Sequence, residues 1–389
     1  MSYTSGRLLW LLLLLGTRLL PAQQDSSYWQ TYIRPLDLQG DSLPAGLALL
    51  DSTVQHYRFF FTAEQHWKTV NTRIQLAFLK YLYEKAGVRN LIVEGGYSYG
   101  YLIDRYLETG DKRLLRKVLT NIPVCPDDQM AMFEALYAFN QSLPPGERIQ
   151  VSGIDLEHAP ELSIQALYTM MPEGEASPPV QRMMNQVRDL HESPYFDKRE
   201  TRQYFRRLNR DLIAREADYR AFWGEDYELV LSMSENVLQG MDFSLIKAVI
   251  FKRQWQTREE QMFRNFVLLA PRLRPGNYYA QFGALHTDIE RSYTWDFPSL
   301  AHRLNYFGES PVANQVLTIS RYLRPMDQHY TELRDYEALR GLVRHVEQAF
   351  PQQIVLASLI GKNSPFDQLR ENFQFILLID PEVEAESCD

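Results

Sequence analysis

The sequence predicts an α/β fold: a mostly parallel sheet flanked by helices, interrupted by a helical insertion of roughly a hundred residues. Two observations favour this fold. Short apolar or aromatic runs bounded by turn residues recur along the chain, and amphipathic stretches lie between them. Between about 160 and 265 the pattern changes to long helical periodicity with many charges and no convincing strand.

The short runs are the predicted strands, and the amphipathic stretches are the predicted helices. The stretch 70–86 carries Ile74, Phe78 and Leu82 at helical spacing and stops before Gly87. A second helix is expected over 126–140 and a short one over 101–108, and a long helical pattern covers 202–223. The expected strands are 57–61, 90–93, 149–154, 278–282, 315–319 and 375–379.

These elements predict one α/β body and no second module. Residues 23–159 form the first part of that body, 160–265 the helical insertion, and 266–389 the second part. Residues 1–22 form a separate export signal, because Arg7 precedes the apolar run 8–15 and small residues follow before Gln23. We therefore expect a periplasmic or secreted protein.

The alternative for this leader is a membrane anchor. A spanning helix needs about 20 apolar residues, and Gly16, Thr17 and Arg18 interrupt this run early. We therefore expect cleavage of the leader and no membrane contact of the mature protein.

Composition excludes several function classes. The chain has 389 residues, 41 basic against 49 acidic, and a formal net charge of −8. Because the basic residues are scattered, we do not expect the protein to bind nucleic acid or anionic lipid. We expect its partner to be a small-molecule substrate. The two cysteines, Cys125 and Cys388, exclude a disulfide scaffold and a cysteine zinc site. They could pair in an oxidising compartment, but we expect no essential bridge.

Ionisable residues follow four of the predicted strands. Glu64 and His66 follow the first, Glu94 the second, Asp155 the third, and His286 the fourth. Ligands of open α/β sheets bind outside the carboxyl ends of the strands, so we expect these five side chains to converge on one crevice. Imidazoles and carboxylates together suit water activation, in which a histidine takes the proton from water and a carboxylate orients that histidine.

The same side chains permit a divalent metal site. His66, His286 and a glutamate would hold the ion and leave a position open for water. The chain contains no H-E-x-x-H motif. A metal ion is therefore an alternative to metal-free water activation.

A second alternative is a serine hydrolase. Residues 96–100 fit G-x-S-x-G between a strand and a helix, and Ser98, Asp155 and His286 follow in serine-hydrolase chain order. However, no HGGG-type oxyanion loop is visible, and Glu64 and His66 would be left without a role.

Several motifs, taken in order, resemble the erythromycin esterase family, which groups by resemblance of fold and motif with the ChaN-like haem-binding proteins and the Tiki/TraB proteins. The similar stretch runs from about Phe59 to Arg291, and 375–380 is similar to the family's last strand. The motifs are Glu64-x-His66, Arg73, 87–94, 139–140, 153–156, 258–262 with Asn265, and 283–286.

The resemblance implies a metal-independent hydrolase in which a histidine activates water against an ester or lactone. It implies that His66 is the general base, Glu64 its orienting partner and Glu94 a second carboxylate. It implies that His286 polarises or protonates the substrate, and that Arg73 stabilises an oxyanion. No cofactor is expected for this reaction.

The chain departs from the family's motifs at three positions. The first motif usually reads Gly-Glu-x-x-His-Gly, and here Ala63 and Trp67 replace its glycines. Only Gln65 separates the acid from the histidine, which is closer to the ChaN-like spacing. In the second motif, usually His-Asn-x-His, Gly283 replaces the first histidine. Macrolide specificity is therefore not expected.

The resemblance to ChaN-like proteins leaves a different class of function open. In that alternative the protein catalyses nothing and binds haem or a metal ion. The ligands would be His66 and His286 together with the clustered tyrosines Tyr97, Tyr99 and Tyr101.

Overall fold

A computed structural model describes most of the chain after the predicted leader. The described residues are 26–40, 42–121, 125–193, 195–245, 251–290, 297–323, 336–367 and 369–384. The predicted leader 1–22 and Cys388 lie outside them, so export stays a prediction. Within the described residues, no helix combines the length and apolar character that crossing a bilayer requires.

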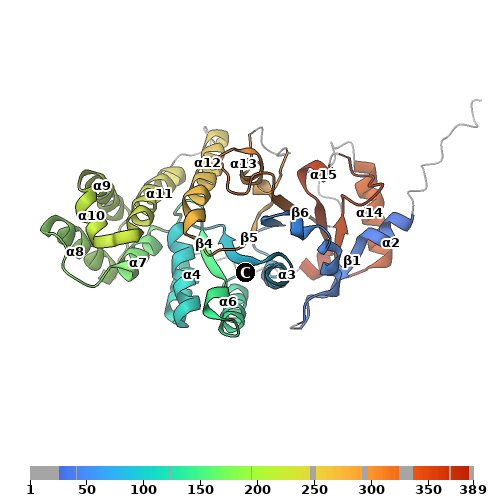
Figure 1. Cartoon of the computed structure of the whole chain (residues 1–389), viewed down its shortest axis with the longest axis horizontal. Helices are drawn as coiled ribbons and strands as arrows, with labels where there is room; N and C mark the ends of the chain where they lie inside the picture. The colour runs from blue at the N-terminus through green and yellow to red at the C-terminus, as the bar shows by residue number, and fades with distance from the viewer. Residues whose placement is uncertain are drawn as a thin grey trace, which may run out of the picture.

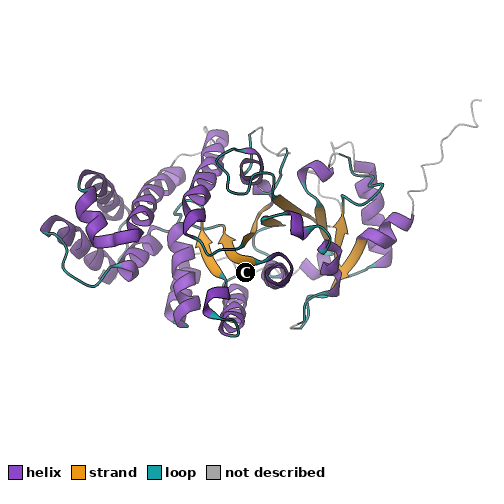
Figure 2. Cartoon of the chain, in the orientation of Figure 1, coloured by secondary structure: helices purple, strands orange, loops and turns teal. Residues whose placement is uncertain are grey.

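One eight-stranded sheet forms the centre of the molecule (Figure 2). Its order is β1-β7-β8-β6-β2-β5-β3-β4. All neighbours from β8 to β4 are parallel, whereas β7 is antiparallel to both β8 and β1. The predicted mostly parallel sheet is thus confirmed. The strands are β1 (Ile33–Leu36), β2 (Phe59–Glu64), β3 (Val88–Val93), β4 (Gln150–Gly153), β5 (Asn277–Gly283), β6 (Val316–Leu323), β7 (Ile354–Ser358) and β8 (Phe375–Ile379).

The six predicted strands are all present, and two further strands were missed. β1 contains Pro35, which lacks an N–H donor and is tolerated because β1 lies at the sheet edge. β7 is a five-residue apolar run, and such a run cannot be told from a buried helical turn by periodicity. Both belong to the antiparallel end of the sheet, away from the strands that carry the candidate site.

Helices cover both faces of the sheet (Figure 1). α3 has the predicted bounds, and it ends because Gly87 adopts φ 64°, a left-handed conformation that glycine takes without strain. The helices are α2 (Ser26–Tyr32), α3 (Val70–Ala86), α4 (Tyr97–Thr109), α5 (Lys112–Asn121), α6 (Pro126–Gln141), α7 (Pro160–Met170), α8 (Pro178–Glu192), α9 (Lys198–Ala214), α10 (Glu216–Trp223), α11 (Tyr227–Leu245), α12 (Phe251–Leu269), α13 (Leu300–Tyr306), α14 (Tyr336–Ala349), α15 (Leu369–Asn372) and α16 (Pro381–Glu384).

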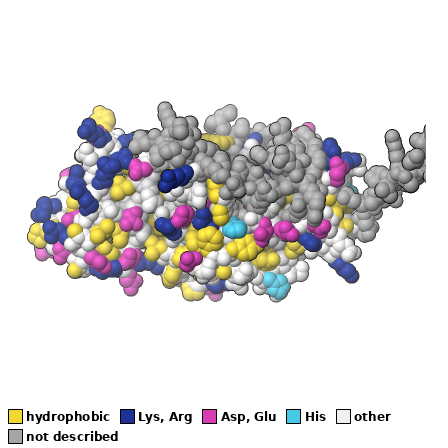
Figure 3. All heavy atoms as spheres, turned by 90° about the horizontal axis from the view of Figure 1, so that it is seen from above, with side chains coloured by type: hydrophobic (Ala, Val, Ile, Leu, Met, Phe, Trp, Pro, Cys, Tyr) yellow, Lys and Arg dark blue, Asp and Glu magenta, His cyan; other side chains and the backbone are white. Residues whose placement is uncertain are grey.

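Helices α7–α11 form a lobe at one end of the molecule, and α12 stands between this lobe and α13 (Figure 1). The expected single helix over 202–223 is two helices, because the backbone at Arg215 leaves helical geometry. Lys and Arg side chains are interspersed with Asp and Glu over this lobe (Figure 3), and Arg215 and Arg220 pair with acids four residues before them.

The lobe and α12 are joined to the sheet by buried amide side chains. Asn236 of α11 donates to the carbonyl of Asp155 at 2.6 Å, and Asn265 of α12 donates to the carbonyl of Ile154 at 2.7 Å. Each bond satisfies a buried backbone oxygen just beyond β4. These bonds fix α12 over the carboxyl end of the sheet.

Candidate active site

A cavity of about 240 Å³ opens at the carboxyl ends of the central strands. It contains four of the five strand-end side chains that the sequence predicts to converge. Apolar, amide and charged side chains complete the wall. The lining residues are Glu64, His66, Trp67, Lys68, Asn71, Thr72, Gln75, Val93, Glu94, Tyr99, Cys125, Gln129, Met132, Phe133, Asp155, His158, Arg258 and Gln281.

His66 lies in the turn after β2 and is half exposed to the cavity, with 49% of its side chain accessible. Its Nδ1 atom is 2.7 Å from Oε1 of Glu64, the last residue of β2. The hydrogen bond to Glu64 raises the pKa of His66 above its usual 6.5, against the opposing effect of burial. This bond occupies Nδ1 and leaves Nε2 facing the cavity.

Glu94 follows β3 and lies beside His66. Its Oε1 atom is 4.0 Å from Nε2 of His66, and its Oε2 accepts a 2.8 Å hydrogen bond from the backbone N–H of Gly283. A Cβ atom at Gly283 would lie 3.2 Å from Nε2 of His66, so the glycine leaves room for the imidazole. Burial alone would raise the pKa of Glu94, but the charges of His286 and Arg258 hold it below its usual value.

A buried guanidinium links two of the predicted acids. Nη2 of Arg258, on α12, is 2.7 Å from Glu94 and 2.5 Å from Oδ2 of Asp155, and its Nε is 2.9 Å from Oδ1 of Asp155. Although burial opposes ionisation, the pKa of Asp155 stays well below its usual value because of Arg258 and His158. Asp155 therefore fixes Arg258, and Arg258 fixes Glu94.

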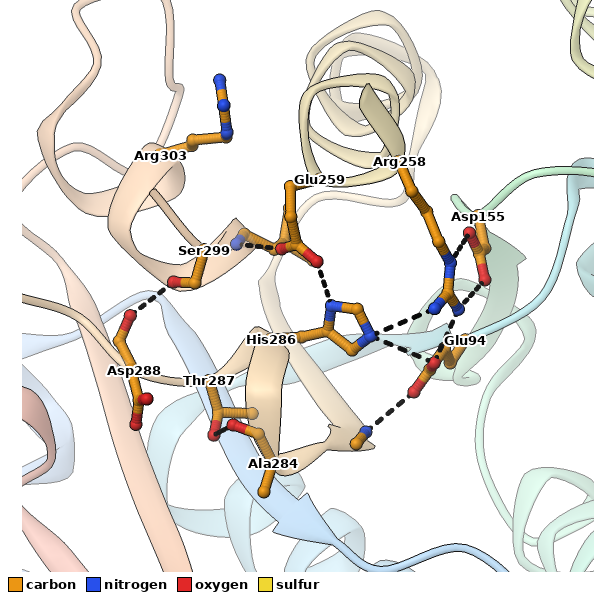
Figure 4. Close-up of polar contacts among 12 residues, drawn as sticks. Glu94, Asp155, Arg258, Glu259, Ala284, His286, Thr287, Asp288, Ser299 and Arg303 are labelled. Atoms are coloured by element: carbon orange, nitrogen blue, oxygen red, sulfur yellow. Dashed lines mark hydrogen bonds and ion pairs between the residues drawn. The ribbon is translucent and has the colours of Figure 1, made fainter. Parts of the chain in front are cut away.

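His286 does not line the cavity, contrary to the expected convergence of all five side chains. Its ring lies between Glu259 and Glu94 (Figure 4). Its Nδ1 contacts Glu259 of α12, and its Nε2 is 3.3 Å from Glu94. Only 3% of the side chain is exposed. Burial disfavours the imidazolium, but Glu259 and Glu94 outweigh it and raise the pKa of His286 to about 10.

This environment changes the role expected for His286. His286 is charged, lies between the carboxylates of Glu259 and Glu94, and does not line the cavity. It is therefore placed to hold Glu94 and not to contact a substrate. Glu259 is fixed in turn, because its Oε2 accepts a 2.6 Å hydrogen bond from the N–H of Leu300.

Arg73 is not brought to the site. It is exposed on α3 and is not one of the residues that line the cavity, although Thr72 and Gln75 of the same helix are. The helical period places Arg73 on another face. The arginine beside the acids is Arg258.

The serine arrangement expected from chain order is not formed. Ser98 is fully buried, and its hydroxyl and N–H both donate to Glu157, at 2.5 and 2.8 Å. Asp155 pairs with Arg258, and His286 contacts Glu259 and Glu94. Ser98, at the start of α4, is thus hydrogen-bonded to the buried carboxyl group of Glu157.

The tyrosines proposed as haem ligands do not share one site. Tyr99 lines the cavity and donates to Gln129 at 3.3 Å. Tyr97 and Tyr101 line a second cavity beside β4. Residues two apart on a helix point in different directions, so this separation follows from α4.

A group of possible metal ligands is present in the cavity, but it differs from the expected set. Glu64, His66 and Glu94 each offer an atom within 4.8 Å of the others. His286 is not in this group, because both of its ring nitrogens face carboxylates behind the cavity.

The sequence predicted no role for several residues that line the cavity, or for the residue that supports His286. Arg258, His158 and Gln281 line the cavity, and Glu259 holds His286. The signal for His158 was its position three residues after Asp155, to which it lies at 3.3 Å. Arg258 and Glu259 belong to the motif 258–262 that resembles the erythromycin esterase family, but they lie in a helical segment, where no strand-end pattern indicates a site residue.

Cys125 also lines the cavity and is disulfide-bonded. Cys388, the other cysteine of the chain, lies outside the described residues.

The fold and the site together define an α/β protein with a histidine–carboxylate cavity at the carboxyl edge of a mostly parallel sheet. No protein-family model matches the chain, and no curated protein matches it in sequence. Solved structures do match it in fold. A Bacillus cereus protein has a TM-score of 0.65 at 12% identity, covering 91% of this chain and 96% of its own.

Two further structures are named by function. A mutant of the erythromycin esterase EreC, in its open conformation, has a TM-score of 0.62 at 12% identity, covering 89% of this chain and 97% of its own. A succinoglycan biosynthesis protein has a TM-score of 0.62 at 13% identity, covering 91% and 95%. The chain therefore has the fold of the erythromycin esterases, as the motifs predict.

Proposed function

We propose that the protein is a hydrolase of small esters or lactones in which His66 activates water. The observation that carries the proposal is the position of the His66 imidazole, with Nδ1 held by Glu64 at 2.7 Å and Nε2 facing Glu94 at 4.0 Å. Water activation needs a base whose orientation is fixed by a partner. Here the base also lies beside a second carboxylate in an accessible cavity.

The two facing atoms are spaced to share one water. If each accepts a hydrogen bond of about 2.8 Å, acceptors at this separation subtend an angle of roughly 90° at the water oxygen, close to the angle between the two O–H bonds. A water held in this way directs one hydrogen to Nε2 of His66 and the other to Glu94. Its lone pairs then face the remaining cavity.

The reaction follows from these positions. His66 takes a proton as the water oxygen bonds to the acyl carbon, and Glu64 stabilises the imidazolium. When the tetrahedral intermediate breaks its bond to the alcohol oxygen, the imidazolium returns the proton to that oxygen. Arg258 and His286 keep Glu94 ionised and in place during both steps.

Cavity size favours small substrates. The volume of about 240 Å³ lies below the roughly 300–1,000 Å³ of pockets that enclose drug-sized ligands. Trp67 stands at the cavity with half of its surface exposed, beside the base. The solved esterase of similar fold is named for erythromycin; for this chain we propose smaller esters.

The test is hydrolysis of small esters and lactones by the purified protein and its His66→Ala variant. General-base catalysis contributes about 10²–10⁴-fold, so the variant is expected to lose at least about 100-fold in kcat/KM. His56→Ala is the matched control, because His56 is exposed on another segment and does not line the cavity. A His66→Ala protein that keeps the parent rate contradicts the proposal.

A second candidate is divalent-metal binding by Glu64, His66 and Glu94, since their ligand atoms lie within 4.8 Å of one another. Two carboxylates and one imidazole would leave coordination positions for water. Against this arrangement, Glu94 is already bonded to Arg258 at 2.7 Å. Elemental analysis of the purified protein, and hydrolysis before and after chelation, decide between the two candidates.

A further inference from the structure

Gln281 lines the candidate cavity and has a buried hydrogen-bond donor without a partner among the described residues. It lies on β5, lines the cavity, and is only 6% exposed. Within the part of the chain that the structure describes, its buried Nε2 atom has no hydrogen-bond partner. A buried amide N–H without an acceptor is costly, so its retention in a cavity points to an acceptor supplied by a ligand.

The neighbouring polar groups do not supply that acceptor. Thr62, directly opposite Gln281 on β2, is hydrogen-bonded to the hydroxyl of Tyr279 at 2.7 Å. Glu94 accepts from Arg258 and from the N–H of Gly283, and no hydrogen bond joins it to Gln281.

The register of the sheet places Gln281 below the proposed base. Gly283 is opposite Glu64 and Gln281 is opposite Thr62, so Gln281 is one side-chain repeat deeper on the same face of the sheet. A group that enters the cavity past His66 therefore approaches Gln281. Apolar side chains of Val93, Met132 and Phe133 also line this cavity.

We propose that Gln281 Nε2 donates a hydrogen bond to the acyl carbonyl oxygen of a short-chain ester, with the acyl group entering first and the alcohol part remaining near Trp67. This inference rests on the proposed hydrolase function. As the water oxygen bonds to the acyl carbon, the carbonyl π electrons move to its oxygen, and the Gln281 N–H stabilises the oxyanion. Collapse of the oxyanion re-forms the carbonyl and expels the alcohol oxygen, which takes its proton from His66.

Arg258 is a poorer candidate for this role. Its guanidinium already donates to Asp155 and Glu94, and turning it toward a substrate would break buried ion pairs. A neutral amide also avoids neutralising the acids that hold His66 and Arg258.

The experiment compares the parent with Gln281→Met, which keeps the length of the side chain and removes the donor, using 4-nitrophenyl acetate. Loss of one oxyanion donor costs about 10²–10³-fold in kcat, and we expect this loss with little change in KM. The thermal midpoint should stay equal or rise, because an unpaired buried group is removed. Gln186→Met is the control, since Gln186 on α8 has an unpaired buried oxygen outside the cavity.

Binding of 4-nitrophenyl methylphosphonate, a tetrahedral analogue, gives a readout that needs no turnover. Calorimetric titration should show binding to the parent, weakened at least about tenfold in Gln281→Met. Equal affinity for both proteins, no binding to the parent, or an unchanged kcat overturns the role of Gln281. If the parent binds the analogue through Gln281 and hydrolyses no ester, the hydrolase proposal fails and the Gln281 site stands. If Gln281→Met does not fold, each measurement is repeated with Gln281→Leu.

Discussion

Nδ1 of His66 lies 2.7 Å from Oε1 of Glu64, two residues before it in the chain. Glu64 ends β2 and is fixed by the parallel ladder to β5, whereas His66 is in the following turn. The hydrogen bond therefore attaches a half-exposed imidazole to the end of a central strand of the sheet. It also raises the pKa of that imidazole.

Replacing Glu64 with glutamine should shift the pH profile of hydrolysis. A base must be neutral, and the Glu64 bond raises the pKa of His66, so the parent gains activity as pH rises through a value above 6.5. In Glu64→Gln the pH at which activity rises should move down toward 6.5. At higher pH, where kcat/KM no longer changes with pH, it should be about 100-fold lower than in the parent. Glu108→Gln, a surface change, should leave the profile in place. A rise in activity that stays at the parent's pH contradicts the pairing.

Removing Arg258 should destabilise the protein strongly. Arg258→Met leaves Glu94 and Asp155 without their buried cation, and breaking such a pair costs about 3–5 kcal/mol of unfolding free energy. Arg264→Met, six residues along the same helix, removes a mostly exposed partner of Glu260 and should cost no more than about 1 kcal/mol. Urea unfolding of both variants measures the difference. Equal losses would mean that the buried cluster contributes little.

The charged state of His286 should make stability fall at alkaline pH. Its folded pKa of about 10 lies above its ordinary 6.5, so its contribution is complete below pH 6.5 and is lost as pH rises toward 10. The thermal midpoint of the parent should therefore exceed that of His286→Gln most at pH 6 to 6.5. The gap should narrow steadily up to pH 10, and a constant gap over that range argues against a charged His286.

Ser98 should not behave as a nucleophile. Its buried hydroxyl is bonded to Glu157, so a serine-directed fluorophosphonate should not label the protein. Ser98→Ala should keep the parent kcat and lose about 1–3 kcal/mol of stability, because Glu157 loses a buried donor. Labelling that disappears in Ser98→Ala would instead restore the serine-hydrolase mechanism.

Trp67 should carry a measurable backbone strain. Its φ of 69° is left-handed, a conformation that costs a residue with a Cβ about 1–2 kcal/mol. Trp67→Ala and Trp67→Gly remove the same indole, and only the glycine variant relieves the strain. The free energy of unfolding of Trp67→Gly should thus be about 1 kcal/mol higher than that of Trp67→Ala. Equal stabilities would show that the turn relaxes around alanine.

The strand-end acids were predictable because the signal is local. Glu64, Glu94 and Asp155 each follow a short apolar run, and parallel strands bring their carboxyl ends to one edge. The same reasoning placed His286 in the crevice, where it failed. Periodicity fixes the strand and not the course of the 3-10 turn at Ala284–His286, which carries the ring behind Glu94.

By itself the sequence determined the mostly parallel sheet, six of its eight strands, the helical character of 160–265 and the neighbouring positions of Glu64 and His66 after one strand, because each depends on residues close together in the chain. Only the tertiary structure decided what surrounds them. Arg258 meets Glu94 across 164 positions, and Nε2 of Gln281 has no hydrogen-bond partner among the residues that the structure describes. Such contacts depend on how α12 packs on the sheet, since burial and distance in three dimensions set their electrostatics.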